Sequence, residues 1–100
     1  MIEFPHERVL VLDRVSRRHP DVTAADAAYA WLHAVRSMPR LGTESAEYAA
    51  IGPDPSGRML EVVAVALPDG SGWLIKYAQH PPQTSIRREL GLDNRKGGRR

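Results

Sequence analysis

Two nearly identical five-residue segments, PDPSG at residues 53–57 and PDGSG at residues 68–72, divide the second half of the chain. Both consist of Pro, Asp, Ser and Gly, which favour tight turns, and a single Asp in each is too few oxygen ligands for a calcium loop. The flanking segments EYAAI, RMLEVVAVAL and WLIKYA are rich in apolar, β-branched and aromatic residues, as strands are. The repeat therefore predicts two hairpin turns, with Gly57 and Gly72 at positive φ, in a three-stranded antiparallel meander.

Folding the chain across these turns also predicts a register and two faces. The face with the bulkier apolar side chains is expected to receive the helices. Lys76, Tyr48 and His80 then lie on, or just beyond, the opposite and more polar face. The expected cross-strand pairs are Leu67–Trp73, Val65–Ile75, Val63–Tyr77, Ile51–Met59 and Ala49–Glu61.

The clearest helix is expected in the segment DVTAADAAYAWLHAVRSM. Thr23 is a favourable N-cap, and Asp26 occupies the capping-box position three residues later. Pro39 is expected to end this helix. Upstream, HERVLVLDRVSRR is compatible with a strand or a helix, and a short helix is favoured. The apolar residues that recur at helical spacing in the main helix are Ala27, Trp31, Ala34, Val35 and Met38.

Together these elements predict a single α+β domain over residues 1–92. Two N-terminal helices are expected to pack on the three-stranded antiparallel meander, and SIRREL is expected to form a short C-terminal helix with Thr84 or Ser85 as its cap. Residues 93–100, DNRKGGRR, are expected to form a basic, disordered tail.

The composition excludes several classes of function. Without cysteine the chain has no disulfide, no thiolate metal site and no cysteine nucleophile. The formal net charge is +2, but without residues 93–100 ten Lys and Arg face eleven Asp and Glu, so net charge alone does not indicate a nucleic-acid-binding protein. The four histidines lack ligand spacing and no cofactor motif occurs, so no metal and no cofactor are expected. With no long apolar run and no signal peptide, the expected location is cytoplasmic, without a membrane partner.

Four segments together resemble one bacterial family: HPDVTAADAAYAW, EYAAIGPDPSGRMLEVVAV, WLIKYA and SIRREL. They are similar to the BrnT-like toxins of type II toxin–antitoxin systems, which share the fold of the RelE ribonucleases. The likeness covers roughly residues 17–92. The last strand departs from the family pattern, because it reads Lys76-Tyr77-Ala78 where the family usually has Ser-Ala-Arg. The matching positions are His19, Tyr48, Gly52, Gly57, Arg58, Leu60 and the triplet Arg87, Arg88 and Glu89.

The resemblance implies a metal-independent endoribonuclease that acts on RNA and is neutralised by a small ribbon-helix-helix antitoxin, either as a monomer or as a homodimer. The altered last strand favours a different class, a non-catalytic protein-binding module that keeps the toxin fold. RNA cleavage without metal needs proton transfer and cations for the phosphate. The candidate catalytic residues are His80 for proton transfer, Lys76 and Arg58 for the phosphate, and Tyr48 on a neighbouring strand.

Candidate RNA-binding residues lie outside the meander. Arg17 and Arg18 form a basic cluster with His19, which can bind phosphate or simply end a solvated helix. Arg87 and Arg88 belong to the expected C-terminal helix. For each candidate the structural alternative is a solvated surface charge or a turn residue.

Overall fold

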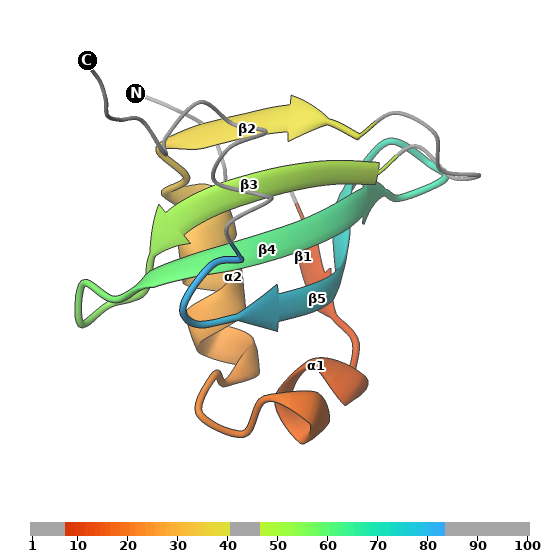
Figure 1. The fold of residues 1–100 in the computed structure, drawn as a ribbon. Coiled ribbons are helices and arrows are strands. Elements are labelled where there is room, and N and C mark those ends of the chain that lie inside the picture. Colours follow the sequence, from red (N-terminus) through yellow and green to blue (C-terminus); the bar gives the residue numbers. More distant parts are fainter. Residues whose placement is uncertain (1–7, 41–46, 84–100) are drawn as a thin grey trace, which may run out of the picture.

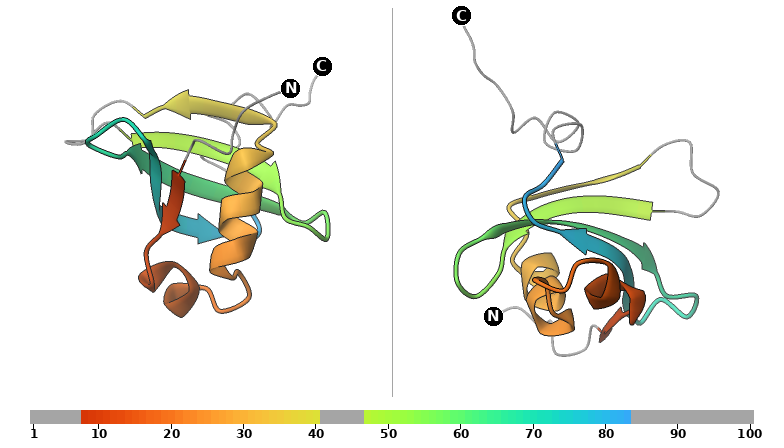
Figure 2. Two further views of the ribbon diagram at one scale, coloured as in Figure 1. Left: turned by 180° about the vertical axis from the view of Figure 1, so that it is seen from behind. Right: turned by 60° about the horizontal axis from the view of Figure 1, so that its bottom comes forward.

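The computed structural model of the protein describes residues 8–40 and 47–83. Five strands form one sheet in the order β1-β5-β4-β3-β2, with β1 parallel to β5 and the other neighbours antiparallel. Both helices lie on one side of this sheet (Figures 1 and 2). The elements are β1 (Arg8–Val11), α1 (Arg14–Arg18), α2 (Ala24–Leu32), β2 (Arg36–Pro39), β3 (Glu47–Pro53), β4 (Met59–Ala66) and β5 (Gly72–Gln79).

The predicted architecture of two helices on a three-stranded meander is wrong, because the meander β3-β4-β5 is only the centre of a five-stranded mixed sheet. The segment RVLV forms β1, an edge strand parallel to β5, and α1 follows it directly, so the ambiguous N-terminal region contains both a strand and a helix. β2 forms the other edge. The predicted C-terminal helix and the tail of residues 93–100 lie outside the described residues.

Helix α2 begins as predicted but ends early. The Thr23 hydroxyl accepts a hydrogen bond from the Asp26 backbone at 3.0 Å, and the Asp26 carboxylate accepts one from the Thr23 backbone at 3.1 Å, which confirms the capping box. The helix ends at Leu32, because residues 36–39 pair with β3 instead of continuing the helical spacing. Pairing with β3 and packing of Met38 on the buried cluster of Ala49 and Ile51 override that spacing.

The two turns place their glycines differently. Gly57 has a φ of 95°, as predicted, but in the second turn Gly70 takes the positive φ, of 76°, instead of Gly72. Gly72 is the first residue of β5 and pairs with Arg8 of β1. A Cβ at position 72 would collide with the backbone of Arg8, so this glycine permits the close approach of β1.

The register of the meander is partly as predicted. Val63 pairs with Tyr77 as expected, whereas Ile51 pairs with Glu61, two residues from the predicted partner. Between the pairs Val63–Tyr77 and Ala64–Ile75, β5 contains one additional residue, Lys76, which forms a β-bulge. Such a bulge breaks the alternation of faces along a strand.

The predicted assignment of the two faces is wrong for β3 and β4, and for Tyr77 in β5. Leu60, Val62 and Ala64 face the helices, and the bulkier face that includes Val63 lies on the other side. The helices bring small side chains to the sheet, and a Cβ at Gly52 would collide with the backbone oxygen of Ala30, so α2 lies directly on β3. The buried core between helices and sheet consists of Val15, Val22, Ala27, Ala30, Leu60, Val62, Ala64, Ile75 and Ala78.

Candidate functional site

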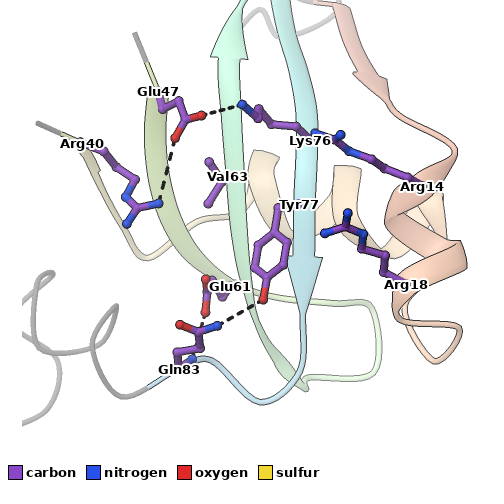
Figure 3. A pocket seen from close by; sticks show the side chains of 9 residues that line it. All are labelled: Arg14, Arg18, Arg40, Glu47, Glu61, Val63, Lys76, Tyr77 and Gln83. Carbon is purple, nitrogen blue, oxygen red and sulfur yellow. Dashed lines mark hydrogen bonds and ion pairs between the residues drawn. The ribbon is translucent and has the colours of Figure 1, made fainter. Parts of the chain in front are cut away.

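A cavity of about 360 Å³ lies on the face of the sheet opposite α2 (Figure 3). Strands β3, β4 and β5 form its floor, and α1 contributes two arginines from the side. All but one of the lining residues are polar, and they include four cationic and two carboxylate side chains. The lining residues are Arg14, Arg18, Arg40, Glu47, Glu61, Val63, Lys76, Tyr77 and Gln83.

The β-bulge in β5 explains why two consecutive polar side chains reach this cavity. Ile75 and Ala78 belong to the core on the helix side, whereas both Lys76 and Tyr77 line the cavity. In a regular strand, neighbouring side chains would point to opposite faces. The additional residue therefore brings an ammonium group and a phenol to the same face.

The cations of the cavity differ in their partners. Lys76 Nζ lies 2.6 Å from Glu47 Oε2, and Arg40 lies 4.0 Å from Glu47 Oε1. Arg14 and Arg18 project from α1 toward the cavity and are exposed (Figure 3). Within residues 8–40 and 47–83, no carboxylate forms an ion pair with either arginine. These two guanidinium groups are therefore open to an anion from solution.

Tyr77 is held in place by its neighbours. Its hydroxyl donates a hydrogen bond to the Gln79 side chain and accepts one from Gln83 Nε2 at 3.3 Å. The His19 ring packs edge-on against the phenol, with ring centroids 5.7 Å apart. Burial raises the pKa of Tyr77, and the negative charge of Glu61 raises it further. The phenol is therefore protonated throughout the neutral range.

Glu61 is the buried carboxylate of the cavity. The residue is only 3% exposed, although it lies in the otherwise apolar strand β4. Its Oε1 accepts a hydrogen bond from the Gln83 backbone at 2.9 Å. This bond ties the segment that follows β5 to the floor of the cavity, beside the hydroxyl of Tyr77.

The structure brings two of the residues predicted from the sequence, Lys76 and Arg18, to the cavity. Arg17 is exposed on α1 but does not line it. Tyr48 lies opposite Ala64, which faces the helices, and packs edge-on against Trp73 at 5.2 Å between ring centroids.

The remaining predicted residues do not join this group. The His80 ring Nδ1 lies 2.8 Å from the backbone oxygen of Met59, and His80 does not line the cavity. Arg87 and Arg88 lie outside the described residues.

Arg58 has a structural environment. Its Nε lies 2.7 Å from the buried carboxylate of Asp54, and its guanidinium donates to the Asp21 backbone oxygen at 2.8 Å. The Asp26 carboxylate, at the start of α2, lies 3.7 Å away. Arg58 thus connects the turn between β3 and β4 to the N-terminal end of α2, and its charge is already matched by carboxylates.

The buried carboxylate of Asp54 should make folding sensitive to acid. Burial alone would raise its pKa, but hydrogen bonds from Arg58 and Ser56 outweigh that effect and hold the pKa well below its usual range. Because the folded-state pKa is depressed, the stabilisation is complete at neutral pH and is lost progressively as the pH falls below about 5. Asp54→Asn should therefore be less stable at pH 7 and show a flatter dependence of unfolding free energy on pH between 7 and 3.

Urea denaturation at pH 7, 5 and 3 measures this difference. Asp13→Asn is the matched control, because Asp13 is exposed and its side chain makes no capping hydrogen bond. Parallel pH profiles for wild type and Asp54→Asn would show that the Asp54 charge does not contribute to folding.

Sequence reasoning missed most of the cavity. Glu61 carried a signal, because a charged residue interrupts the apolar run RMLEVVAVAL, but the predicted register assigned it to the helix face. Tyr77 was assigned to the same wrong face, because a bulge cannot be read from alternation alone. The predicted register also assigns Val63 to the helix face. The other missed residues are Arg14, Arg40, Glu47 and Gln83, for which the sequence pattern carries no signal.

A scan against protein-family models and searches of curated proteins and of solved structures find no match to this chain. Among residues 8–40 and 47–83, no helix is long and apolar enough to cross a membrane. In the same described part of the chain, no three His, Asp or Glu side chains cluster as a metal site requires.

Proposed function

We propose that the protein is a metal-independent endoribonuclease of the cytoplasm that binds and cuts RNA in the cavity above β3, β4 and β5. The observation that carries the proposal is the grouping of three kinds of side chain in one cavity. These are cations that can hold a phosphate, a buried carboxylate, and a phenol that is protonated at neutral pH. Together they supply the chemical groups that RNA cleavage needs without a metal.

In the proposed reaction the 2′-hydroxyl oxygen of RNA attacks the adjacent phosphorus while the bond from phosphorus to the 5′-oxygen breaks. Glu61 accepts the proton of the 2′-hydroxyl, and Tyr77 donates a proton to the departing 5′-oxygen. Arg14, Arg18 and Lys76 stabilise the negative charge that develops on the phosphate oxygens. The products are a 2′,3′-cyclic phosphate and a 5′-hydroxyl, so no water and no external oxidant or reductant is consumed.

The same proposal includes the biological setting that the family resemblance implies, a toxin neutralised by a small ribbon-helix-helix antitoxin. A neighbouring gene for such a protein, whose product binds this chain and suppresses its activity, would support it. One observation favours the alternative, a non-catalytic protein-binding module: the Tyr77 hydroxyl already donates to Gln79 and Lys76 is already paired with Glu47. RNA must displace both contacts before the cavity can act.

Arg14 and Arg18, which form no ion pair with a carboxylate of residues 8–40 and 47–83, provide the test of the binding step. Replacing Arg14 and Arg18 together by Gln should weaken binding of a single-stranded RNA decamer about tenfold. The salt dependence of binding should become shallower by roughly 0.7 in log–log slope for each lost phosphate contact. Arg8→Gln with Arg36→Gln is the matched control, because both residues are exposed, lie outside the cavity and carry the same total charge.

The cleavage assay uses purified protein, a mixed RNA pool and a chelator, with a mock preparation beside it. Cleavage above the mock level with 2′,3′-cyclic phosphate ends is the expected result. If wild type cuts no better than the mock preparation, the nuclease proposal fails and the protein-binding module replaces it. If the Arg14/Arg18 variant binds RNA as tightly as the Arg8/Arg36 control, the cavity is not the RNA site.

A further inference from the structure

Lys76 is already paired with a carboxylate in the free protein. Its ammonium nitrogen lies 2.6 Å from Glu47, and the two side chains are only 29% and 12% exposed. Figure 3 shows the Lys76 ammonium group turned toward Glu47 of β3, while Arg14 and Arg18 approach the cavity from α1. A phosphate that contacts Lys76 must therefore compete with a carboxylate that the fold holds beside the same ammonium group.

Glu47 also has a second cation within reach. Its Oε1 lies 4.0 Å from the Arg40 guanidinium, and the Arg40 backbone donates a hydrogen bond to the Glu47 backbone oxygen at 2.8 Å. A carboxylate displaced from Lys76 therefore stays next to a positive charge. This arrangement lowers the free energy needed to separate Glu47 from Lys76, so the exchange can occur when a ligand arrives.

The cations of the cavity thus differ in whether a phosphate must displace a carboxylate before it can bind them. Among the described residues Arg14 and Arg18 form no ion pair and can bind a phosphate directly, whereas a phosphate at Lys76 must compete with Glu47. A phosphate already held by the two arginines raises the local concentration of the next phosphate of the same strand near Lys76. A polyanionic strand can therefore make the exchange more readily than a separate phosphate.

We propose that Glu47 is a specificity-determining residue that acts as an internal competitor of the ligand phosphate at Lys76. It limits the affinity of the cavity for polyanions and keeps Lys76 paired until a strand is bound. That the strand is RNA rests on the proposed function. The competition itself follows from the Lys76–Glu47–Arg40 arrangement and does not depend on cleavage.

The test compares wild type with Glu47→Gln, which removes the charge and keeps the shape. The probes are a 2′-O-methyl RNA decamer, which cannot be cleaved, and inorganic polyphosphate. Glu47→Gln should bind the decamer about fivefold more tightly, with a log–log salt slope steeper by up to roughly 0.7. Asp69→Asn is the matched control, because it makes the same change in net charge at an exposed turn outside the cavity.

Combining Glu47→Gln with Lys76→Gln tests whether the gain in affinity comes from the release of Lys76. Most of the gain in affinity from Glu47→Gln should disappear there, because only Arg40 then remains beside position 47. The inference is overturned if Glu47→Gln binds no more tightly than Asp69→Asn, if its full gain persists without Lys76, or if no variant binds either probe. Tighter binding of polyphosphate by Glu47→Gln, with no binding of RNA by any variant, would retain the inference and refute the proposed function.

Discussion

Tyr77→Phe should lower the rate constant of RNA cleavage by about a hundredfold or more while leaving RNA affinity close to that of wild type. The substitution removes only the hydroxyl, so the ring keeps its edge-on contact with His19. In the proposed reaction this hydroxyl supplies the proton of the departing oxygen. Because burial and the charge of Glu61 raise its pKa above the ordinary value of 10.0, the rate should not fall through loss of this proton below about pH 10. Single-turnover cleavage, measured from pH 6 to 10, tests both points.

Tyr29→Phe is the matched control for this experiment. Tyr29 is exposed on α2, outside the cavity, and Tyr29→Phe removes the same hydroxyl group. It should cleave at the wild-type rate. If Tyr77→Phe also keeps the wild-type rate, Tyr77 is not the proton donor. If His80→Ala instead abolishes cleavage, the assignment made from the sequence is correct and the cavity is not the catalytic site.

The sequence predicts the types of residue in the candidate site better than their positions. Lys76 stands out because it interrupts an apolar strand, and Arg18 because it belongs to a basic cluster, and both line the cavity. Arg58 is an equally suitable residue type, but three carboxylates surround it: Asp21 before α2, Asp26 within α2, and Asp54. Such pairing cannot be predicted from the sequence, because the partners of Arg58 lie up to 37 residues away.

The fold was predictable where local signals are strong. The capping box of α2 and the turn at Gly57 follow from short-range chemistry, and the structure contains both. The edge strand β2 was not predictable, because RSMP contains a proline and has little β propensity. A proline is compatible with a strand at the edge of a sheet, where its missing N–H need not be paired. Pairing with β3, rather than the residues of β2 themselves, determines this strand.

Leu60→Ala should destabilise the protein by about 2–5 kcal/mol, because Leu60 belongs to the main core between the helices and the sheet. Leu60 is 0% exposed and is among the largest fully buried side chains. Its neighbours in the core are mainly alanines and valines, which have too little volume to refill the space that the substitution leaves. Urea denaturation monitored by circular dichroism measures the loss.

Leu10→Ala is the control that shows whether the loss of stability comes from the burial of Leu60 or from shortening any leucine in a strand. Leu10 also lies in a strand but is 40% exposed, so Leu10→Ala should cost less than about 1 kcal/mol. A loss at Leu60 as small as the one expected at Leu10 would mean that Leu60 is not a core residue, and the assignment of the β4 faces would then be reversed. That result would also remove Glu61 from the cavity, because neighbouring residues of a regular strand point to opposite faces. The stability measurement therefore tests the geometry on which the proposed RNA site depends.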